Sequence, residues 1–288
     1  MSLLRVENLT YTYNPNTPFC KDAIIDVNFT AEKGEIIGII GHTGSGKSTL
    51  VQHLNGLLRA TQGKIFYKEK DIWENPKEIR KIRSEIGLVF QYPEYQLFDE
   101  TVYSDVAFGP KNMGLDSSKV DVSVKNSLKS VGISEDFYDK SPFDLSGGEK
   151  RRVAIAGVLA MQPEIIIFDE PTAGLDPKGR ETILEIIKNY REQNNATVFV
   201  VSHSMEDMAL IADKILVLNK GSVAMFDTPK RIFSKRDELS SIGLDVPQIT
   251  QVVHGLIDKG FDLPNDIITV DEAVSVINKL RQGGGSND

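Results

Sequence analysis

Residues 35–49 read EIIGIIGHTGSGKST, an isoleucine-rich run that passes directly into a glycine-rich loop. The run has the length and composition of a buried strand, and apolar residues recur at helical spacing from Leu50 to Leu58. Strand, loop and helix are the context that the phosphate-binding pattern G-x-x-x-x-G-K-[ST] requires, and Gly41–Ser48 match that pattern. This stretch therefore predicts a nucleotide-phosphate site on an α/β fold.

The loop supplies several kinds of phosphate ligand. Its glycines let successive backbone N–H groups turn toward phosphate oxygens, and the helix N-terminus adds the positive end of its dipole. We expect Lys47 to reach the β- and γ-phosphates and the Ser48 hydroxyl to ligate Mg²⁺. The alternative, a glycine turn that only packs, is disfavoured by the strand and helix around it. The expected nucleotide contacts are Gly41, His42, Thr43, Gly44, Ser45, Gly46, Lys47, Ser48 and Thr49.

Strand-like and helix-like segments alternate along the rest of the chain. EIIIFDE (164–170), ATVFVVSH (196–203) and KILVLNKG (214–221) read as strands, and helical patterns separate them. Such alternation is typical of an α/β domain with a mostly parallel sheet flanked by helices. KIFYKEKDIW (64–73) predicts a small antiparallel β subdomain, and residues 92–160 predict a helical subdomain.

The pattern changes near residue 235. We expect a nucleotide-binding domain over 1–235, a helical appendage over 236–282 and a disordered tail, GGGSND, at 283–288. The apolar stripe within 249–257 is too large for so short a segment to bury alone. It predicts contact with the body of the domain or with a second subunit.

Capping signals predict where the appended helices begin. Asp245 stands where the N-cap of the first helix is expected, with Pro247 in its first turn. Thr269 and Glu272 have capping-box spacing at the start of the second helix.

Composition excludes several classes of protein. The 288 residues carry 33 basic and 41 acidic side chains, a net charge of −8, which disfavours nucleic acid as the main partner. No apolar run approaches the ~20 residues of a membrane-spanning helix, and no secretory signal is visible, so we expect a cytosolic chain. With Cys20 alone, neither an intrachain disulfide nor a cysteine metal site is expected. His42 and His53 are interpreted as loop and helix-surface residues without a catalytic role.

The strand EIIIFDE ends in two acids that suit a phosphate site. Asp169 is expected to hold Mg²⁺ through water, as the acid at the end of such a strand does in nucleoside triphosphatases. Glu170 follows at the carboxyl end of the strand, where ligands bind in open α/β sheets, and is the candidate base that polarises the attacking water. The alternative for Glu170 is an exposed strand-end carboxylate.

LSGGE (145–149) resembles the signature motif of the ATP-binding cassette (ABC) ATPases, and it lies in the family's order between the glycine loop and EIIIFDE. The spacing of Ser146 and Glu149 predicts a capping box, so Ser146, Gly147 and Gly148 would present an anion-binding helix N-terminus. The resemblance implies that this N-terminus meets the γ-phosphate held by a second subunit. Glu149 replaces the commoner glutamine, which leaves open whether both composite sites of such a dimer are equally active.

Further motifs extend the resemblance over about residues 3–235 and imply a P-loop NTPase of the ABC type. Gln91 matches the Q-loop glutamine that touches Mg²⁺ and water, and AGLD, ending at Asp176, resembles the D-loop. His203 matches the switch histidine on the γ-phosphate. Tyr13 takes the place of the adenine-stacking aromatic, although Tyr11 lies close by and either ring could belong to the core.

The sequence after Gln91 narrows the family. PEYQ (93–96) and ETVYSDVAFGP (100–110) resemble the ATPases of energy-coupling factor (ECF) vitamin transporters, kin of the cobalt and nickel importers, and GHTGSGKST most resembles the second of their two ATPase paralogues. The resemblance implies an integral-membrane T-component that lays coupling helices in a groove beside the Q-loop. Pro93, Glu94 and Gln96 are the expected partner contacts, with Glu94 pairing with a partner arginine. The alternative is a polar loop that covers the helical subdomain.

Together these resemblances imply a peripheral ATPase on the cytoplasmic face of the cell membrane that drives uptake of a micronutrient. The implied partners are ATP, a paralogous ATPase in a heterodimer rather than a homodimer, the T-component and a substrate-binding S-component, with the appendage in the dimer contact. One alternative makes the cargo Co²⁺ or Ni²⁺. Another is a soluble clamp acting on ribosomes or DNA, which the acidic balance disfavours.

Overall fold

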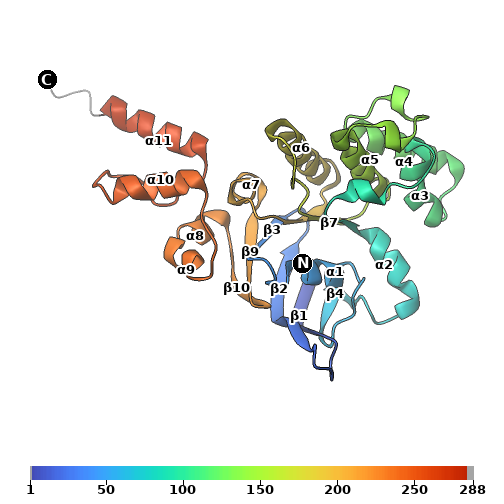
Figure 1. The fold of residues 1–288 in the computed structure, drawn as a ribbon, viewed down its shortest axis with the longest axis horizontal. Coiled ribbons are helices and arrows are strands. Elements are labelled where there is room, and N and C mark those ends of the chain that lie inside the picture. The colour runs from blue at the N-terminus through green and yellow to red at the C-terminus, as the bar shows by residue number, and fades with distance from the viewer. Residues whose placement is uncertain (1, 284–288) are drawn as a thin grey trace.

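A six-stranded sheet forms the centre of the computed structural model, which describes residues 2–283 (Figure 1). Its order is β10-β9-β3-β8-β7-β6; β10 pairs antiparallel with β9, and the other neighbours run parallel. The strands are β3 (Ile36–Ile40), β6 (Ile86–Val89), β7 (Ile165–Asp169), β8 (Thr197–Val201), β9 (Lys214–Asn219) and β10 (Ser222–Asp227).

Both faces of this sheet are covered. Side chains alternate between the faces of a strand, so Ile165 and Ile167 enter one hydrophobic core while Ile166 and Phe168 enter the other. β3, β7 and β8 are buried at every position. This burial explains why these strands read as continuous apolar runs rather than as alternating ones.

A second, antiparallel sheet lies beside the first, with the order β2-β1-β4-β5. It contains β1 (Ser2–Tyr13), β2 (Lys21–Glu32), β4 (Gln62–Tyr67) and β5 (Lys70–Asp71). Helix α1 (Lys47–Leu54) follows the glycine loop and packs into the core that joins the two sheets, with Leu50, Val51 and Leu54 buried there. The start of α1 is therefore held at the carboxyl edge of the central sheet.

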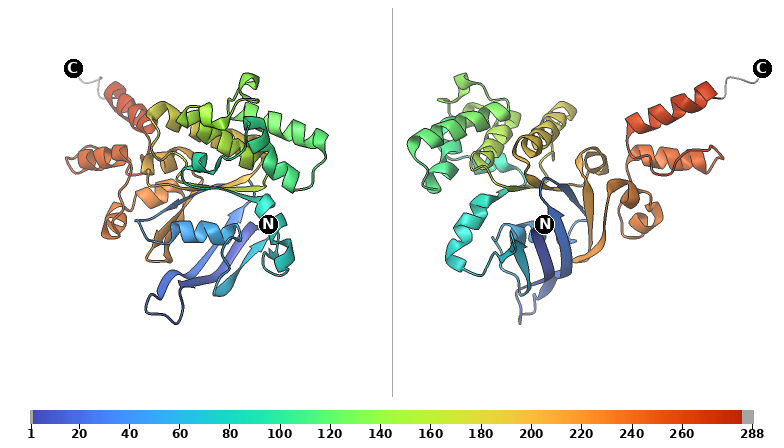
Figure 2. Two further views of the ribbon diagram at one scale, coloured as in Figure 1. Left: turned by 45° about the vertical axis from the view of Figure 1, so that its right-hand side comes forward. Right: turned by 180° about the vertical axis from the view of Figure 1, so that it is seen from behind.

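Helices gather over residues 93–159 and stand at the opposite end of the molecule from the C-terminal helices (Figure 2). They are η2 (Pro93–Gln96), α3 (Val102–Asn112), α4 (Ser117–Ser130), η3 (Glu135–Phe137), η4 (Pro142–Asp144) and α5 (Gly147–Leu159). Thr101, Asp116 and Ser146 cap α3, α4 and α5 through side-chain oxygens. The remaining helices before the C-terminal part are η1 (Pro76–Glu78), α2 (Ile79–Glu85), α6 (Pro177–Asn194) and α7 (Met205–Ile211).

Up to residue 283, the C-terminal part contains the helices α8 (Pro229–Phe233), α9 (Arg236–Ser241), α10 (Gln248–Ile257) and α11 (Val270–Gly283). The expected N-cap at Asp245 is wrong, because Pro247 occupies the N-cap position of α10. Val246 is buried in the main core, so the chain stays extended there and leaves Asp245 exposed. Thr269 does cap α11, since its hydroxyl accepts the Glu272 N–H at 3.3 Å. The tail GGGSND, apart from Gly283 at the end of α11, lies outside the described residues.

The apolar stripe of α10 is covered in part by α11 and the loop before it. Val253, Ile267 and Ala273 form a small core of their own. On the outer side Val252 stays 57% exposed and Val274 on α11 stays 51% exposed. The appendage therefore keeps apolar surface uncovered within a single chain.

The interpretation of His53 as a helix-surface residue is wrong. Its side chain is fully buried, at 0% exposure, because α1 lies between two sheets and has little solvent-facing surface. Nδ1 donates to the Thr49 carbonyl at 2.7 Å, one turn earlier in the helix. Burial lowers the pKa of His53 below its ordinary 6.5, although the bond to Thr49 opposes that shift.

This buried imidazole makes stability depend on pH. The unfolded chain takes up a proton near the ordinary pKa and the folded chain does so only at lower pH, so the free energy of unfolding falls as the pH drops below about 6.5. The free energy of unfolding, measured with urea, should be higher at about pH 7.5 than at about pH 5.5. We expect His53→Gln to reduce this difference by about 1 kcal/mol. His254→Gln, in the appendage, is the control; an undiminished pH dependence in His53→Gln contradicts the assignment.

Candidate nucleotide-binding site

One cavity of about 440 Å³ brings together most of the residues predicted to contact nucleotide. The glycine loop forms one wall, Gln91 and the ends of β7 and β8 form another, and Tyr13 lies at the end of β1. Sequence reasoning missed Lys21 and Ala23, which enter the lining because β2 pairs with β1 opposite Tyr13. The lining is Tyr13, Lys21, Ala23, Thr43, Gly44, Gly46, Lys47, Ser48, Thr49, Gln91, Asp169, Glu170 and His203.

The glycine loop takes its shape from close backbone packing. Gly46 has a φ of +107°, and a Cβ there would lie 2.5 Å from the Ala23 carbonyl oxygen, so only glycine fits. Lys47 is buried and its Nζ donates to the carbonyls of Gly41 at 2.7 Å and His42 at 3.2 Å. The ammonium group thus spans the inside of the loop, where phosphate oxygens would be received.

Burial and the nearby carboxylates shift the pKa of Lys47 in opposite directions. Burial lowers the pKa of Lys47, while the carboxylates of Glu170 and Asp169 raise it. The net direction is downward, which reflects how far the ammonium group is removed from water. A bound triphosphate would add negative charge to this space and favour the protonated form.

The end of β7 carries two acids with different surroundings. Asp169 is buried, and burial raises its pKa while a hydrogen bond from the Ser48 hydroxyl lowers it. Glu170 has a φ of +52°, a left-handed conformation uncommon for a residue with a Cβ, and its N–H donates to the Val201 carbonyl at 3.0 Å. The turn directs the Glu170 carboxylate into the nucleotide cavity.

The environment of Glu170 suits a proton acceptor. Burial raises the pKa of Glu170 to about 7. His203 Nε2 lies 3.2 Å from its Oε1, but outside hydrogen-bond geometry, and within residues 2–283 no donor satisfies this buried oxygen. A water molecule beside this pair would find an acceptor in the Glu170 oxygen.

The signature residues lie elsewhere. The capping box is present, with the Ser146 hydroxyl accepting the Glu149 N–H at 3.4 Å and the Glu149 carboxylate accepting the Ser146 N–H at 2.9 Å. Ser146 and Gly147 are exposed at the start of α5 and do not line the chain's own cavity. Asp176 is likewise exposed and caps α6 by accepting the Gly179 N–H at 2.8 Å.

Glu94 forms an ion pair within its own chain that the sequence analysis did not predict. Both carboxylate oxygens bind Arg151 of α5 in the same chain, at 2.7 Å and 3.0 Å, so a partner arginine would have to share this carboxylate with Arg151 or displace it. Burial alone would raise the pKa of Glu94, but the hydrogen bonds and charge of Arg151 outweigh it and lower the pKa. The sequence offered little signal for this pair, because Arg151 lies 57 residues away and beside a second arginine.

Arg151 also reaches the loop that follows Glu170. Its Nη1 donates to the carbonyls of Ala173 at 2.7 Å and Pro171 at 3.3 Å. With a side chain only 4% exposed, it links η2, α5 and the end of β7 through one guanidinium group.

A groove of about 690 Å³ lies between α2, α3 and α5. Phe98 and Phe108 line it, half-exposed, with their rings edge to face at 5.0 Å. Of the three predicted partner contacts, Gln96 lines the groove, whereas Pro93 is buried and Glu94 faces Arg151.

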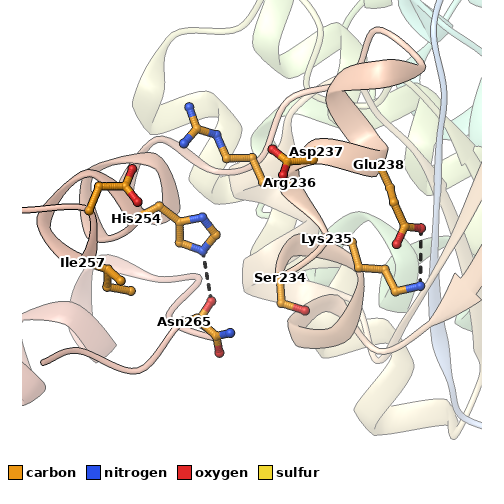
Figure 3. A pocket seen from close by; sticks show the side chains of 9 residues that line it. Ser234, Lys235, Arg236, Asp237, Glu238, His254, Ile257 and Asn265 are labelled. Carbon is orange, nitrogen blue, oxygen red and sulfur yellow. Dashed lines mark hydrogen bonds and ion pairs between the residues drawn. The ribbon is translucent and has the colours of Figure 1, made fainter.

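A cavity of about 460 Å³ in the C-terminal part has a different character (Figure 3). Its lining mixes basic residues such as Lys235 with acids such as Glu238, and these two pair at 3.5 Å. His254 Nε2 lies 3.2 Å from the Asn265 carbonyl oxygen. None of the described residues that line this cavity is a glycine, so it has no counterpart of the glycine loop in the phosphate site.

Comparison with known proteins agrees with the geometry. The model of the ABC transporter family matches residues 24–173. The dimeric structure of the ATP-binding cassette MJ0796, in a post-hydrolysis state bound to ADP and Pi, superposes with a TM-score of 0.70 at 30% identity over 78% of this chain and 98% of that chain. Fold and site together define an ATP-binding cassette.

More similar proteins narrow the family further. EcfA2, the energy-coupling factor transporter ATP-binding protein of Clostridium acetobutylicum, is 53% identical over 94% of this chain and 95% of that protein. The protein of the same name from Clostridioides difficile is 51% identical over 99% of both. The structure of cbiO1 from Clostridium perfringens, part of the ABC transporter complex cbiONQ, has a TM-score of 0.75 at 38% identity over 88% of this chain and 98% of that chain. The chain belongs to the ABC transporter family, among its energy-coupling factor ATP-binding proteins.

Lys47 is the most direct test of the phosphate site. Lys47→Ala removes a buried ammonium group, and each charge-assisted hydrogen bond lost is worth about 1.5–3 kcal/mol, so we expect ATP affinity to fall roughly 100-fold. Titration calorimetry measures the dissociation constant. Lys188→Ala, on the exposed side of α6 and outside the cavity, is the control; ATP binding that survives Lys47→Ala contradicts the assignment.

The Glu94–Arg151 pair is testable by a double-mutant cycle. Arg151→Met leaves a partly buried carboxylate without its partner, and we expect it to lower the free energy of unfolding by about 3 kcal/mol. Glu94→Gln together with Arg151→Met should cost clearly less than the two single changes added. The exposed pair Lys235 and Glu238, changed in the same way, should show coupling below about 1 kcal/mol; equal coupling for both pairs would contradict the buried bridge.

Proposed function

We propose that this chain is one half of an ATP-driven clamp at the cytoplasmic face of the membrane. The chain is the ATP-hydrolysing subunit of an energy-coupling factor importer, a member of a transporter complex with other subunits. The proposal concerns how it closes and what it binds. Among residues 2–283, no helix combines the length and apolarity that crossing a bilayer demands.

One observation carries the proposal: the signature N-terminus is exposed and lies outside the chain's own nucleotide cavity. A helix N-terminus capped by Ser146 is an anion site, and the anion it suits is the γ-phosphate held by a second glycine loop. Two such chains, or this chain and a paralogue, would each complete the other's site. The related cassette MJ0796 is dimeric with ADP and Pi bound.

The cavity residues fit Mg²⁺ bound together with ATP. The Ser48 hydroxyl touches the buried Asp169 carboxylate, and Gln91 lines the same space, so oxygen ligands of the kind that Mg²⁺ prefers converge there. We assign Ser48 and Gln91 as direct ligands and Asp169 as a ligand through water. Bound Mg²⁺ would neutralise charge on the phosphates during transfer.

The chain's own residues account for the rest of the reaction. Lys47 holds the β- and γ-phosphates, and Tyr13 stacks on the adenine. Glu170 takes the proton of the attacking water, with His203 and Gln91 orienting that water. The new bond forms from water oxygen to the γ-phosphorus while the bond to the β-phosphate oxygen breaks, so ADP and phosphate leave. Hydrolysis removes the γ-phosphate that bridges the two subunits, and the clamp reopens.

The groove over α2, α3 and α5 is our proposed docking place for a coupling helix of an integral-membrane T-component. Its exposed aromatic pair, Phe98 and Phe108, and Gln96 at the rim suit an amphipathic helix. Glu94 would join this contact by sharing its carboxylate between Arg151 and a partner arginine, or by exchanging one for the other. The exposed apolar face of the appendage, including Val252 and Val274, would serve the dimer contact.

The cargo follows from the transporter class rather than from this chain. We propose uptake of a micronutrient, most simply a vitamin, bound by a separate S-component, with a paralogous ATPase as the partner in a heterodimer. Co²⁺ or Ni²⁺ as cargo is the second possibility, which transport assays with the assembled complex would distinguish. A clamp on ribosomes or DNA is not supported, because the relatives at about half identity are transporter proteins.

The base assignment has a specific test. Glu170→Gln keeps the shape of the side chain but cannot accept a proton, so we expect ATP hydrolysis to fall about 100-fold or more while ATP binding is retained. Because hydrolysis reopens the clamp, ATP should trap a closed dimer, which light scattering detects. Glu181→Gln, on the exposed side of α6, is the control. Wild-type hydrolysis in Glu170→Gln would contradict the role of this carboxylate.

A further inference from the structure

Four residues at and behind the wall of the nucleotide cavity form a closed ring of contacts. The rings of Tyr13 and Tyr11 meet edge to face at 4.8 Å, and Tyr11 meets His53 in the same manner at 4.6 Å. His53 Nδ1 donates to the Thr49 carbonyl at 2.7 Å. The Thr49 hydroxyl lies 3.3 Å from the Tyr13 hydroxyl and completes the ring.

The four members differ in what they face. Tyr13 and Thr49 line the cavity, whereas Tyr11 and His53 do not. His53 is fully buried, and Tyr11 packs against the core that joins the two sheets. Tyr11 and His53 therefore support Tyr13 from the side away from the nucleotide.

We propose that Tyr11 and His53 are positioning residues that hold Tyr13 ready to stack on the nucleotide base. This inference rests on the proposed function, in which Tyr13 takes the adenine. It assigns a role to the histidine of the glycine-loop helix and resolves the ambiguity between the two tyrosines: Tyr13 contacts the base, and Tyr11 supports it.

The place of Tyr13 in the chain explains why it needs such support. It is the last residue of β1, and the loop at 14–20 follows it. A side chain at a strand end has fewer neighbours to restrict its rotamer, and ordering it only when the ligand arrives would reduce affinity. The edge-to-face contact with Tyr11 restrains the ring of Tyr13, and the Thr49 hydroxyl restrains its tip.

The ring of contacts also joins the base site to the phosphate site. Thr49 and His53 belong to α1, the helix that begins with Lys47, whereas Tyr11 and Tyr13 belong to β1 of the antiparallel sheet. The contacts between them keep the aromatic platform at a fixed distance from the glycine loop. A nucleotide would then meet both sites in their bound arrangement.

The buried Nε2 atom of His53 indicates that its imidazole ring serves the contact with Tyr11 as well as the hydrogen bond to Thr49. Nδ1 is used by the Thr49 carbonyl, while Nε2 is buried, and none of the described residues bonds to it. A buried nitrogen without a partner is costly, so packing alone would favour an apolar residue here. The flat ring against Tyr11 together with a donor to Thr49 is a combination that an aliphatic side chain does not offer.

The experiment compares two ligands on the full-length chain. ATP uses both the base and phosphate sites, whereas inorganic tripolyphosphate uses the phosphate site alone, so the ratio of their dissociation constants reports the base contact. Calorimetry gives both constants for Tyr11→Leu, His53→Gln and Tyr13→Ala. Tyr11→Phe keeps the ring and is the conservative rescue. Val6→Ala, at a buried position on β1 in the same core, is the control for loss of stability alone.

We expect Tyr13→Ala to weaken ATP binding roughly tenfold, as loss of one base–aromatic stack does. Tyr11→Leu and His53→Gln should each weaken it roughly threefold to fivefold, with tripolyphosphate binding within about twofold of wild type. Tyr11→Phe and Val6→Ala should keep the wild-type ratio. Adding Tyr11→Leu to Tyr13→Ala should change the ratio no further, because Tyr11 acts through Tyr13.

The results that would contradict the positioning role can be distinguished from a failure of the base contact itself. If Tyr13→Ala weakens ATP but neither Tyr11→Leu nor His53→Gln changes the ratio, the positioning role is overturned and the base contact stands. If both ligands weaken in parallel, the two residues are structural only, which also overturns the inference. If Tyr13→Ala leaves the ratio unchanged, the base contact itself fails. Should Tyr11→Leu not fold, His53→Gln decides the question by the same ratio.

Discussion

The burial of α1 between two sheets sets the position of each group in the nucleotide cavity. Leu50 and Leu54 fill the core that both sheets share, so the glycine loop is held at the carboxyl edge of β3. The neighbouring parallel strands end at the same edge, which places Asp169 and His203 opposite Lys47. Electrostatic stabilisation of a transferring phosphoryl group depends on such fixed geometry, because charges that must reorganise contribute less.

In the proposed dimer, one chain supplies only half of each nucleotide site, and helix α5 would connect that site to two partners. α5 presents the signature N-terminus outward, away from the chain's own cavity, while its Arg151 holds the η2 segment and the loop after Glu170 together. A partner in the groove and a partner at the signature would thus both act on α5. This common element explains in physical terms how a membrane subunit and ATP could respond to each other: both bias the placement of one helix.

Two wrong predictions and one unforeseen ion pair share one cause. Asp245 had the right residue type for an N-cap, but burial of Val246 kept the chain extended and moved the start of α10. His53 followed an amphipathic helix pattern, yet the second sheet covered its face. Glu94 was expected to pair with an arginine of a partner, and in the structure Arg151 of its own chain binds both of its oxygens. In each case a contact between distant residues outweighed a local preference.

The buried strands β3, β7 and β8, the glycine loop and the acids at the end of β7 were predictable from sequence, because burial on both faces demands apolar runs and phosphate binding demands glycine and lysine at fixed spacing. Only the tertiary structure decided which side chains share a cavity. Lys21, the Glu94–Arg151 pair and the contacts around Tyr13 join segments whose approach depends on how the two sheets pack. That packing is set by the whole core at once, so no local pattern encodes it.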